Sequence, residues 1–150
     1  MRLLLVVVAG SLAPVLAGCG GGGRPAVVPA WGKVLLKQRD GALVPMGGAK
    51  LVFAPVAGGE SLPAFPAARA AADGSFRLGT FGADDGAPVG EYVVTVEWKE
   101  RQRPQYDVMN RGEVDRGRDK LGGKYADRST SSLRATVAAG QELTLVVPAP

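Results

Sequence analysis

From residue 27 onward, apolar and polar side chains alternate with a period of two, and this alternation constrains the fold more than any other feature. The clearest stretch covers residues 91–99, where apolar and polar residues take turns. The apolar set is Tyr92, Val94, Val96 and Trp98. Successive side chains of a strand point to opposite faces of a sheet, so this pattern predicts a half-buried strand. Similar stretches predict strands at 32–38, 49–55, 66–72, 75–81, 133–137 and 142–147.

Turn residues separate these stretches. Asp40-Gly41 and Asp73-Gly74 predict type I′ hairpin turns, and Ala139-Gly140 suits a tight turn before the last strand. The chain has 22 glycines and 11 prolines in 150 residues, and no segment keeps a helical period over three turns. We therefore expect about seven short strands in antiparallel order, packed as one all-β sandwich over residues 27–150.

The order of the motifs resembles a known family. The stretches are "KVLLKQRDGALVPMGGAKLVFAPV", "AADGSFRLGTF" and "PVGEYVVTVEW". Over residues 32–98 they resemble the carboxypeptidase regulatory-like, transthyretin-like (prealbumin-like) sandwich, and the ending at 124–147 is similar to that of small bacterial lipoproteins carrying this domain. The motifs consist of core and turn residues, so the resemblance implies a fold and says little about function.

The first 19 residues have the layout of an export signal. Arg2 precedes an apolar run from Leu3 to Val8 that extends to Ala17. A spanning helix needs about 20 predominantly apolar residues, so a signal peptide is the better interpretation of this shorter, interrupted run.

The run ends at the only cysteine of the chain, in the order Leu16, Ala17, Gly18, Cys19. This order resembles the bacterial lipobox, which implies a diacylglyceryl group on the Cys19 sulfur, acylation by palmitate-like chains, and Cys19 as the mature N-terminus. The alternative is cleavage after Ala17, which would leave Cys19 as a free thiol. We expect a signal peptide at 1–18 and a lipidated cysteine with a glycine-rich tether at 19–26.

Two acyl chains anchor a protein stably where one does not, so the expected location is the cell envelope. In the best-known sorting rule for bacterial lipoproteins, an Asp after the cysteine retains the protein on the inner membrane. This chain has Gly20 there, which favours the outer membrane, with the domain on its periplasmic or surface face.

The chain has no histidine. Its absence excludes Ser-His-Asp and Cys-His nucleophiles and most zinc and non-haem iron sites. The transthyretin-like family includes a hydrolase that depends on histidines, and this chain lacks them. We therefore expect neither an enzyme nor a cofactor. Asp84, Asp85 and Glu91 lack the spacing of a calcium loop, and turn formation is the better interpretation of the two aspartates.

A charged segment at 101–128 interrupts the strand pattern, and the formal net charge of the chain is +4. Six of its basic residues are candidates for a surface that binds an anionic polysaccharide, a lipid headgroup or an envelope protein: Arg101, Arg103, Arg111, Arg116, Arg118 and Lys120. The alternative is a solvated loop. Nucleic acid is not expected as a partner, because the chain carries an export signal and no series of aromatic residues accompanies the charges.

The aromatic residues leave a second function open. Trp31, Tyr106, Trp98 and Tyr125 could stack on sugars, although Trp98 is also well placed for the core and Tyr125 for packing the returning chain on the sandwich. We expect a non-enzymatic, lipid-anchored envelope protein with a structural, adhesive or accessory role. The alternative is a surface module that binds carbohydrate or another small ligand.

Overall fold

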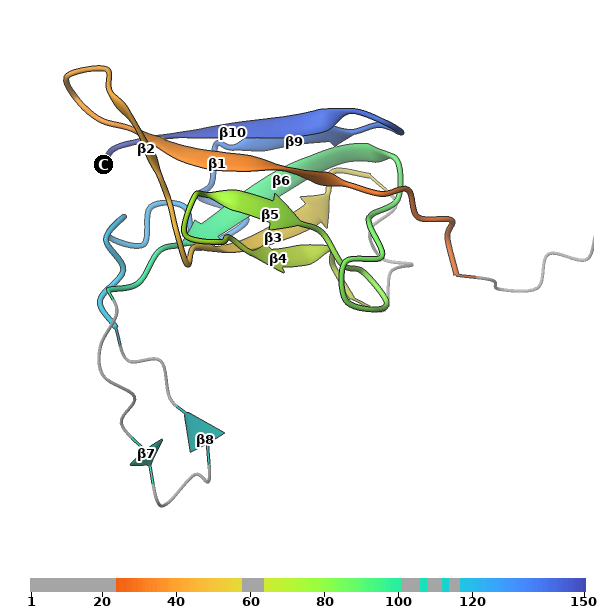
Figure 1. Ribbon diagram of the computed structural model, residues 1–150, viewed down its shortest axis with the longest axis horizontal. Helices are drawn as coiled ribbons and strands as arrows, with labels where there is room; N and C mark the ends of the chain where they lie inside the picture. Colours follow the sequence, from red (N-terminus) through yellow and green to blue (C-terminus); the bar gives the residue numbers. More distant parts are fainter. Residues whose placement is uncertain (1–23, 58–63, 101–105, 108–111, 114–116) are drawn as a thin grey trace, which may run out of the picture.

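The computed structural model describes residues 24–57, 64–100, 106–107, 112–113 and 117–150. Within these ranges the chain is all-β, with two four-stranded sheets packed face to face and no helix (Figure 1). The predicted all-β sandwich is confirmed. The lipobox, Cys19 and the glycines that follow it lie outside the described residues.

The first sheet is built around β1 (Trp31–Lys37). β10 (Glu142–Pro148) pairs with β1 along its whole length. The second half of β1 also pairs with β2 (Leu43–Pro45), and its first half with β5 (Ser75–Arg77). One strand therefore holds the other three in place.

The second sheet has the order β4-β3-β6-β9. Its strands are β3 (Lys50–Pro55), β4 (Ala67–Arg69), β6 (Gly90–Glu97) and β9 (Arg134–Val137). A separate two-stranded pair consists of β7 (Tyr106–Asp107) and β8 (Gly112–Glu113). The period-two stretches thus predicted most strands of both sheets, whereas β2, β7 and β8 were not predicted.

The core lies between the inner faces of the two sheets. Val34 from β1 and Leu145 and Val147 from β10 contribute from one sheet. Phe53 of β3 touches both layers: its ring centroid lies 6.1 Å from that of Phe76 in β5 and 5.9 Å from that of Tyr92 in β6. The core side chains sit on alternate positions of the strands, as the sequence pattern predicted.

Two features of the pairing differ from the prediction. β1 and β10 run parallel, while the other strand pairs are antiparallel. Alternation predicts which side chains share a face of a strand but not the direction of the strand relative to its neighbour. A hairpin would impose an antiparallel pair, but β1 and β10 lie at opposite ends of the described chain and no hairpin connects them. The sheets also hold eight strands rather than about seven.

The predicted type I′ turns are wrong. Gly41 and Gly74 have positive φ angles of 88° and 80°, but neither preceding aspartate does. In both turns the glycine N–H donates to the carbonyl three residues earlier, at Gln38 and Ala71. This is a type I turn followed by a left-handed glycine, which needs only one residue of positive φ. The Ala139-Gly140 turn is confirmed and leads from β9 in one sheet to β10 in the other.

Gly32 marks the closest approach between backbones in the first sheet. Any Cβ at this position would overlap the carbonyl of Leu143 in β10. We predict that Gly32→Ala lowers the free energy of unfolding by about 1–3 kcal/mol or more, because β1 and β10 must move apart. Gly82→Ala is the control, since its Cβ would meet only Asp85 Oδ2 at 3.8 Å. Urea unfolding of the two variants measures the difference; equal midpoints would contradict the prediction.

Candidate functional site

The sandwich has two ends of different character. At one end, which we call the entry end, the described chain begins at Arg24 and passes residues 79–91 (Figure 1). Val28 and Ala87 exchange two backbone hydrogen bonds there, of 2.9 and 3.0 Å. The opposite end, which we call the far end, carries residues 37–43, 97–100 and 117–125 and the C-terminus (Figure 1).

Trp98 organises the far end. Its Nε1 donates to the carbonyl of Gly47 over 3.0 Å, and its ring packs against the core. The Lys120 ammonium lies 4.3 Å from the centroid of the Trp98 ring, within the range of a cation–π contact. Trp98 is therefore a structural residue that also holds a cation at the surface.

Asp119 places Lys120 beside that ring. The Asp119 carboxylate accepts hydrogen bonds from the backbone N–H groups of Trp98, Leu121 and Gly123, at 3.0, 3.2 and 2.8 Å. These bonds fix a turn whose central residue is Lys120. No sequence pattern indicated this arrangement, because Trp98 and Asp119 are 21 positions apart.

The described part of the charged segment packs onto the sandwich. Leu121 and Tyr125 are each 1% exposed, and the Tyr125 hydroxyl donates to the carbonyl of Pro148 over 3.0 Å. The expectation that Tyr125 packs the returning chain against the sandwich is confirmed. Residues 117–125 thus form a fixed platform rather than a solvated loop.

Of the six basic candidates, the structure describes Arg118 and Lys120, and both are exposed at the far end. Arg101, Arg103, Arg111 and Arg116 lie outside the described residues, as does the side chain of Tyr106. Other cations at this end, which the sequence analysis did not select, are Lys37, Arg39, Lys99 and Lys124. Two of these cations bind groups of the sandwich itself: Arg39 Nη2 donates to the Pro150 carbonyl, and Lys99 forms an ion pair with Glu97 at 3.8 Å.

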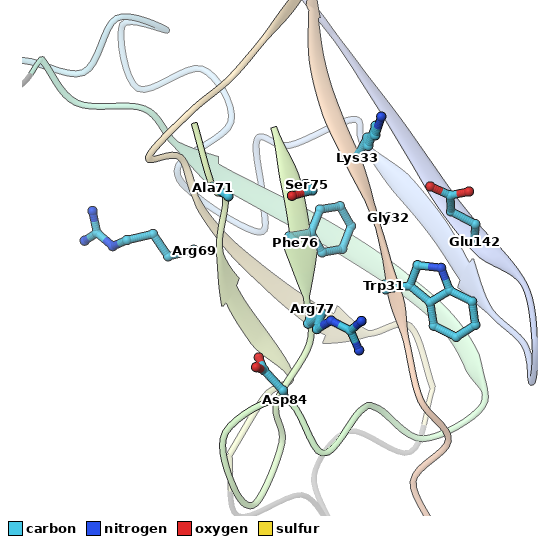
Figure 2. Close-up of a pocket in the computed structure, with 10 residues that line it drawn as sticks. All are labelled: Trp31, Gly32, Lys33, Arg69, Ala71, Ser75, Phe76, Arg77, Asp84 and Glu142. Carbon is cyan, nitrogen blue, oxygen red and sulfur yellow. The ribbon is translucent and has the colours of Figure 1, made fainter. Parts of the chain in front are cut away.

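A hollow of about 380 Å³ lies on the outer face of the first sheet (Figure 2). Trp31 of β1 has Glu142 of β10 and Arg77 of β5 as its register partners, so the three side chains form a row across three strands. Lys33 follows Trp31 on the same face, and Arg69 also lines the hollow. Trp31 is half-buried and the charged residues are exposed.

The sequence analysis selected Trp31 but missed its neighbours in this hollow. Lys33 and Arg77 lie in the stretches 32–38 and 75–81, which were predicted only as strands. Their meeting depends on the pairing of β1 with β5, which a single-strand pattern does not contain. An aromatic face flanked by cations and by two carboxylates, Glu142 and Asp84, suits a small polar ligand.

The aspartates at the entry end serve the turn. Both Asp85 carboxylate oxygens accept backbone N–H bonds, from Thr80 at 2.7 Å, Phe81 at 3.1 Å and Gly82 at 2.9 Å. Asp84 adopts a left-handed backbone angle of 57°. Glu91 is exposed on β6. In the described ranges no three acidic, histidine or cysteine side chains come together as a metal site.

Hydrogen bonds lower the pKa of three turn aspartates. The backbone N–H of Thr80 is the main cause at Asp85. The hydroxyl of Ser75 lowers the pKa of Asp73, and the hydroxyl of Ser129 lowers that of Asp127. In the core, burial raises the pKa of Tyr92, whose hydroxyl donates to the Pro88 carbonyl over 2.6 Å.

Comparison with known proteins adds no relative: no family model, no curated protein and no solved structure matches the chain. Among the residues that the structure describes, no helix has the length and apolarity to cross a bilayer.

The lowered pKa of Asp85 predicts a pH dependence of stability. Its folded pKa lies below the ordinary 3.8, so its ionised form stabilises the fold above that value and loses this effect as the pH falls through the folded pKa. We predict that Asp85→Asn unfolds at lower urea than the wild type near pH 7, and that the gap narrows as the pH falls below 3.8 and through the lowered pKa of Asp85.

Asp40→Asn is the control, because Asp40 accepts a single backbone N–H bond, from Ala42. A gap between Asp85→Asn and wild type that stayed constant over this pH range would contradict the prediction.

Proposed function

We propose that the protein is a non-enzymatic, lipid-anchored β-sandwich of the bacterial cell envelope, of the transthyretin-like kind, which presents its basic far end to an anionic envelope partner. One observation carries the proposal. The described chain joins the sandwich at the entry end, directly after the tether, while residues 117–125 lie at the far end (Figure 1) and carry the exposed Arg118 and Lys120.

The placement of the chain entry and the cations at opposite ends supports a role in presenting the far end to a partner. Five residue steps separate Cys19 from Arg24, and a fully extended chain of that length spans about 17 Å. A lipid on Cys19 would therefore keep the entry end close to the bilayer and hold the far end away from it. The cations at the far end would then face other components of the envelope, with the structural, adhesive or accessory role expected from the sequence.

The platform at 117–125 supports the choice of the far end as the contact surface. Asp119 and Trp98 hold Lys120 in one position, so binding to an anionic partner costs little side-chain ordering. Surface cations of this kind contribute mainly to the rate and specificity of association, and their effect weakens as salt rises. The outer membrane remains the favoured site of the anchor.

One series of variants tests the anchor and the contact surface. In a bacterial host, wild type and Gly22→Ala should incorporate radiolabelled palmitate and stay with the membranes, whereas Cys19→Ala should lose both properties. Arg118→Glu/Lys120→Glu should keep the label but lose cross-linked adducts formed by formaldehyde in intact cells. Lys33→Glu/Arg77→Glu, a charge reversal of equal size in the hollow, should keep both.

Each part of the proposal can fail separately in this series. A wild-type protein that takes up no label would remove the anchor. Adducts that survive the far-end reversal but disappear with the reversal in the hollow would move the contact surface to the outer face of the first sheet.

A second candidate function rests on the hollow itself. Trp31 offers part of its ring beside Arg77 and Lys33, which suits a carbohydrate or another small polar ligand. We predict that any oligosaccharide retained by the wild type in a glycan array binds at least about fivefold more weakly to Trp31→Ala, taking the about 1–3 kcal/mol that an aromatic side chain contributes to stacking on a nucleic-acid base as the scale of the loss. Trp98→Phe is the aromatic control, and an equal loss in both variants would contradict this assignment.

A further inference from the structure

Exposed apolar side chains gather at the entry end. Val56, Phe65 and Val89 are 49%, 39% and 62% exposed. Single exposed apolar residues are common on protein surfaces, but a group at one end of a domain marks a contact surface. Leu43 and Val146 are also exposed, and they lie toward the far end.

Hydrogen bonds place the three residues on neighbouring strand ends. The Val56 N–H donates to the carbonyl of Glu91 over 2.9 Å, directly after the end of β3. Val89 precedes the first residue of β6. Phe65 precedes Pro66, whose carbonyl accepts the Phe53 N–H over 2.8 Å. All three therefore sit on backbone that pairing with β3 or β6 holds in place.

The chain enters the domain at the same end. Arg24 lies with its guanidinium 5.3 Å from the centroid of the Phe81 ring, in the turn that Asp85 fixes. The tether of about 17 Å at most leads from there to Cys19. A lipid at Cys19 keeps the three apolar residues within reach of the membrane to which it belongs, so contact with the bilayer becomes an intramolecular event.

The charges at this end decide which kind of membrane contact is feasible. Three cations, Arg24, Arg77 in the row of Glu142 and Arg128 beside Pro55, are outnumbered by four carboxylates: Asp84, Asp85, Glu91 and Glu142. Such a surface is not drawn to anionic headgroups. Its affinity for the bilayer must come from apolar contact at the boundary between headgroups and acyl chains.

We propose that the entry end rests on the bilayer, with Val56, Phe65 and Val89 in contact with the lipid boundary. This inference rests on the anchor of the proposed function and goes beyond it, because a flexible tether alone sets no orientation. The apolar contact selects one orientation of the domain, in which the far end points away from the membrane and the hollow at Trp31 opens sideways.

A quenching experiment on the full-length protein tests the contact. Cys19 is the only native cysteine, and its sulfur is blocked when the lipid is attached, so an added cysteine is the one reactive thiol. Val89→Cys and Leu43→Cys receive the same fluorophore and are reconstituted in phosphatidylethanolamine–phosphatidylglycerol vesicles that contain brominated lipid. Leu43 is the matched control, an apolar residue 52% exposed at the far end.

We expect the label at residue 89 to be quenched at least about twofold more strongly than the label at residue 43, since bromine quenches only at short range within the apolar boundary. Equal quenching of the two labels in protein that mass spectrometry shows to be lipidated would overturn the inference and leave the anchor intact. So would self-quenching of the residue 89 label without brominated lipid, because a second copy of the chain would then cover this end.

If mass spectrometry shows that the isolated wild-type protein carries no lipid, the same experiment still separates the two proposals. If its residue 89 label is still quenched on vesicles, the entry end binds the bilayer by itself, and only the anchor is wrong. If the label is not quenched, both proposals fall.

Discussion

The pairing of β1 with three other strands is the interaction on which the remaining structure depends. β1 pairs with β10 so closely at Gly32 that no side chain fits between Gly32 and the Leu143 carbonyl. The two halves of β1 also pair with β5 and β2. Its inward residue Val34 is fully buried. The same strand supplies Trp31 and Lys33 to the hollow on the outer face, so one strand serves the core and a candidate ligand surface at once.

The two ends of the sandwich divide their chemistry in a simple way. The entry end has turns, exposed apolar side chains and carboxylates that bind backbone N–H groups. The far end has Lys120 fixed on a platform by Asp119 and Trp98. The two ends keep a fixed orientation relative to each other, because two closely packed sheets do not bend between their ends. An anchor at one end and a binding surface at the other would then need no moving part.

Period-two alternation was sufficient to predict the longer strands and their faces. Tyr92, Val94 and Val96 are buried as expected, and β6 begins and ends within two residues of the predicted stretch. Strand direction, sheet membership and the short strand β2 depend on pairing between distant segments, which alternation does not encode. The turn type was wrong for a local reason: a glycine after an aspartate is compatible with more than one hairpin.

The candidate sites were harder to predict from the sequence than the fold. Charge clustering in 101–128 drew attention to Arg118 and Lys120, but the partners that fix Lys120 are Trp98 and Asp119, and their contact is visible only in three dimensions. The row of Glu142, Trp31 and Arg77 joins the last strand, the first strand and one from the middle of the chain. No spacing rule within a single segment could bring these residues together.

The parallel pairing of β1 with β10 has a consequence for how the molecule is made. Trp31 finds its partner Glu142 only when the 110 residues between them have been made, so the first sheet stays incomplete until β10 has been synthesised. Contacts between such distant segments also slow folding. Under the proposed export, this late closure would leave the first sheet open until β10 has crossed the membrane.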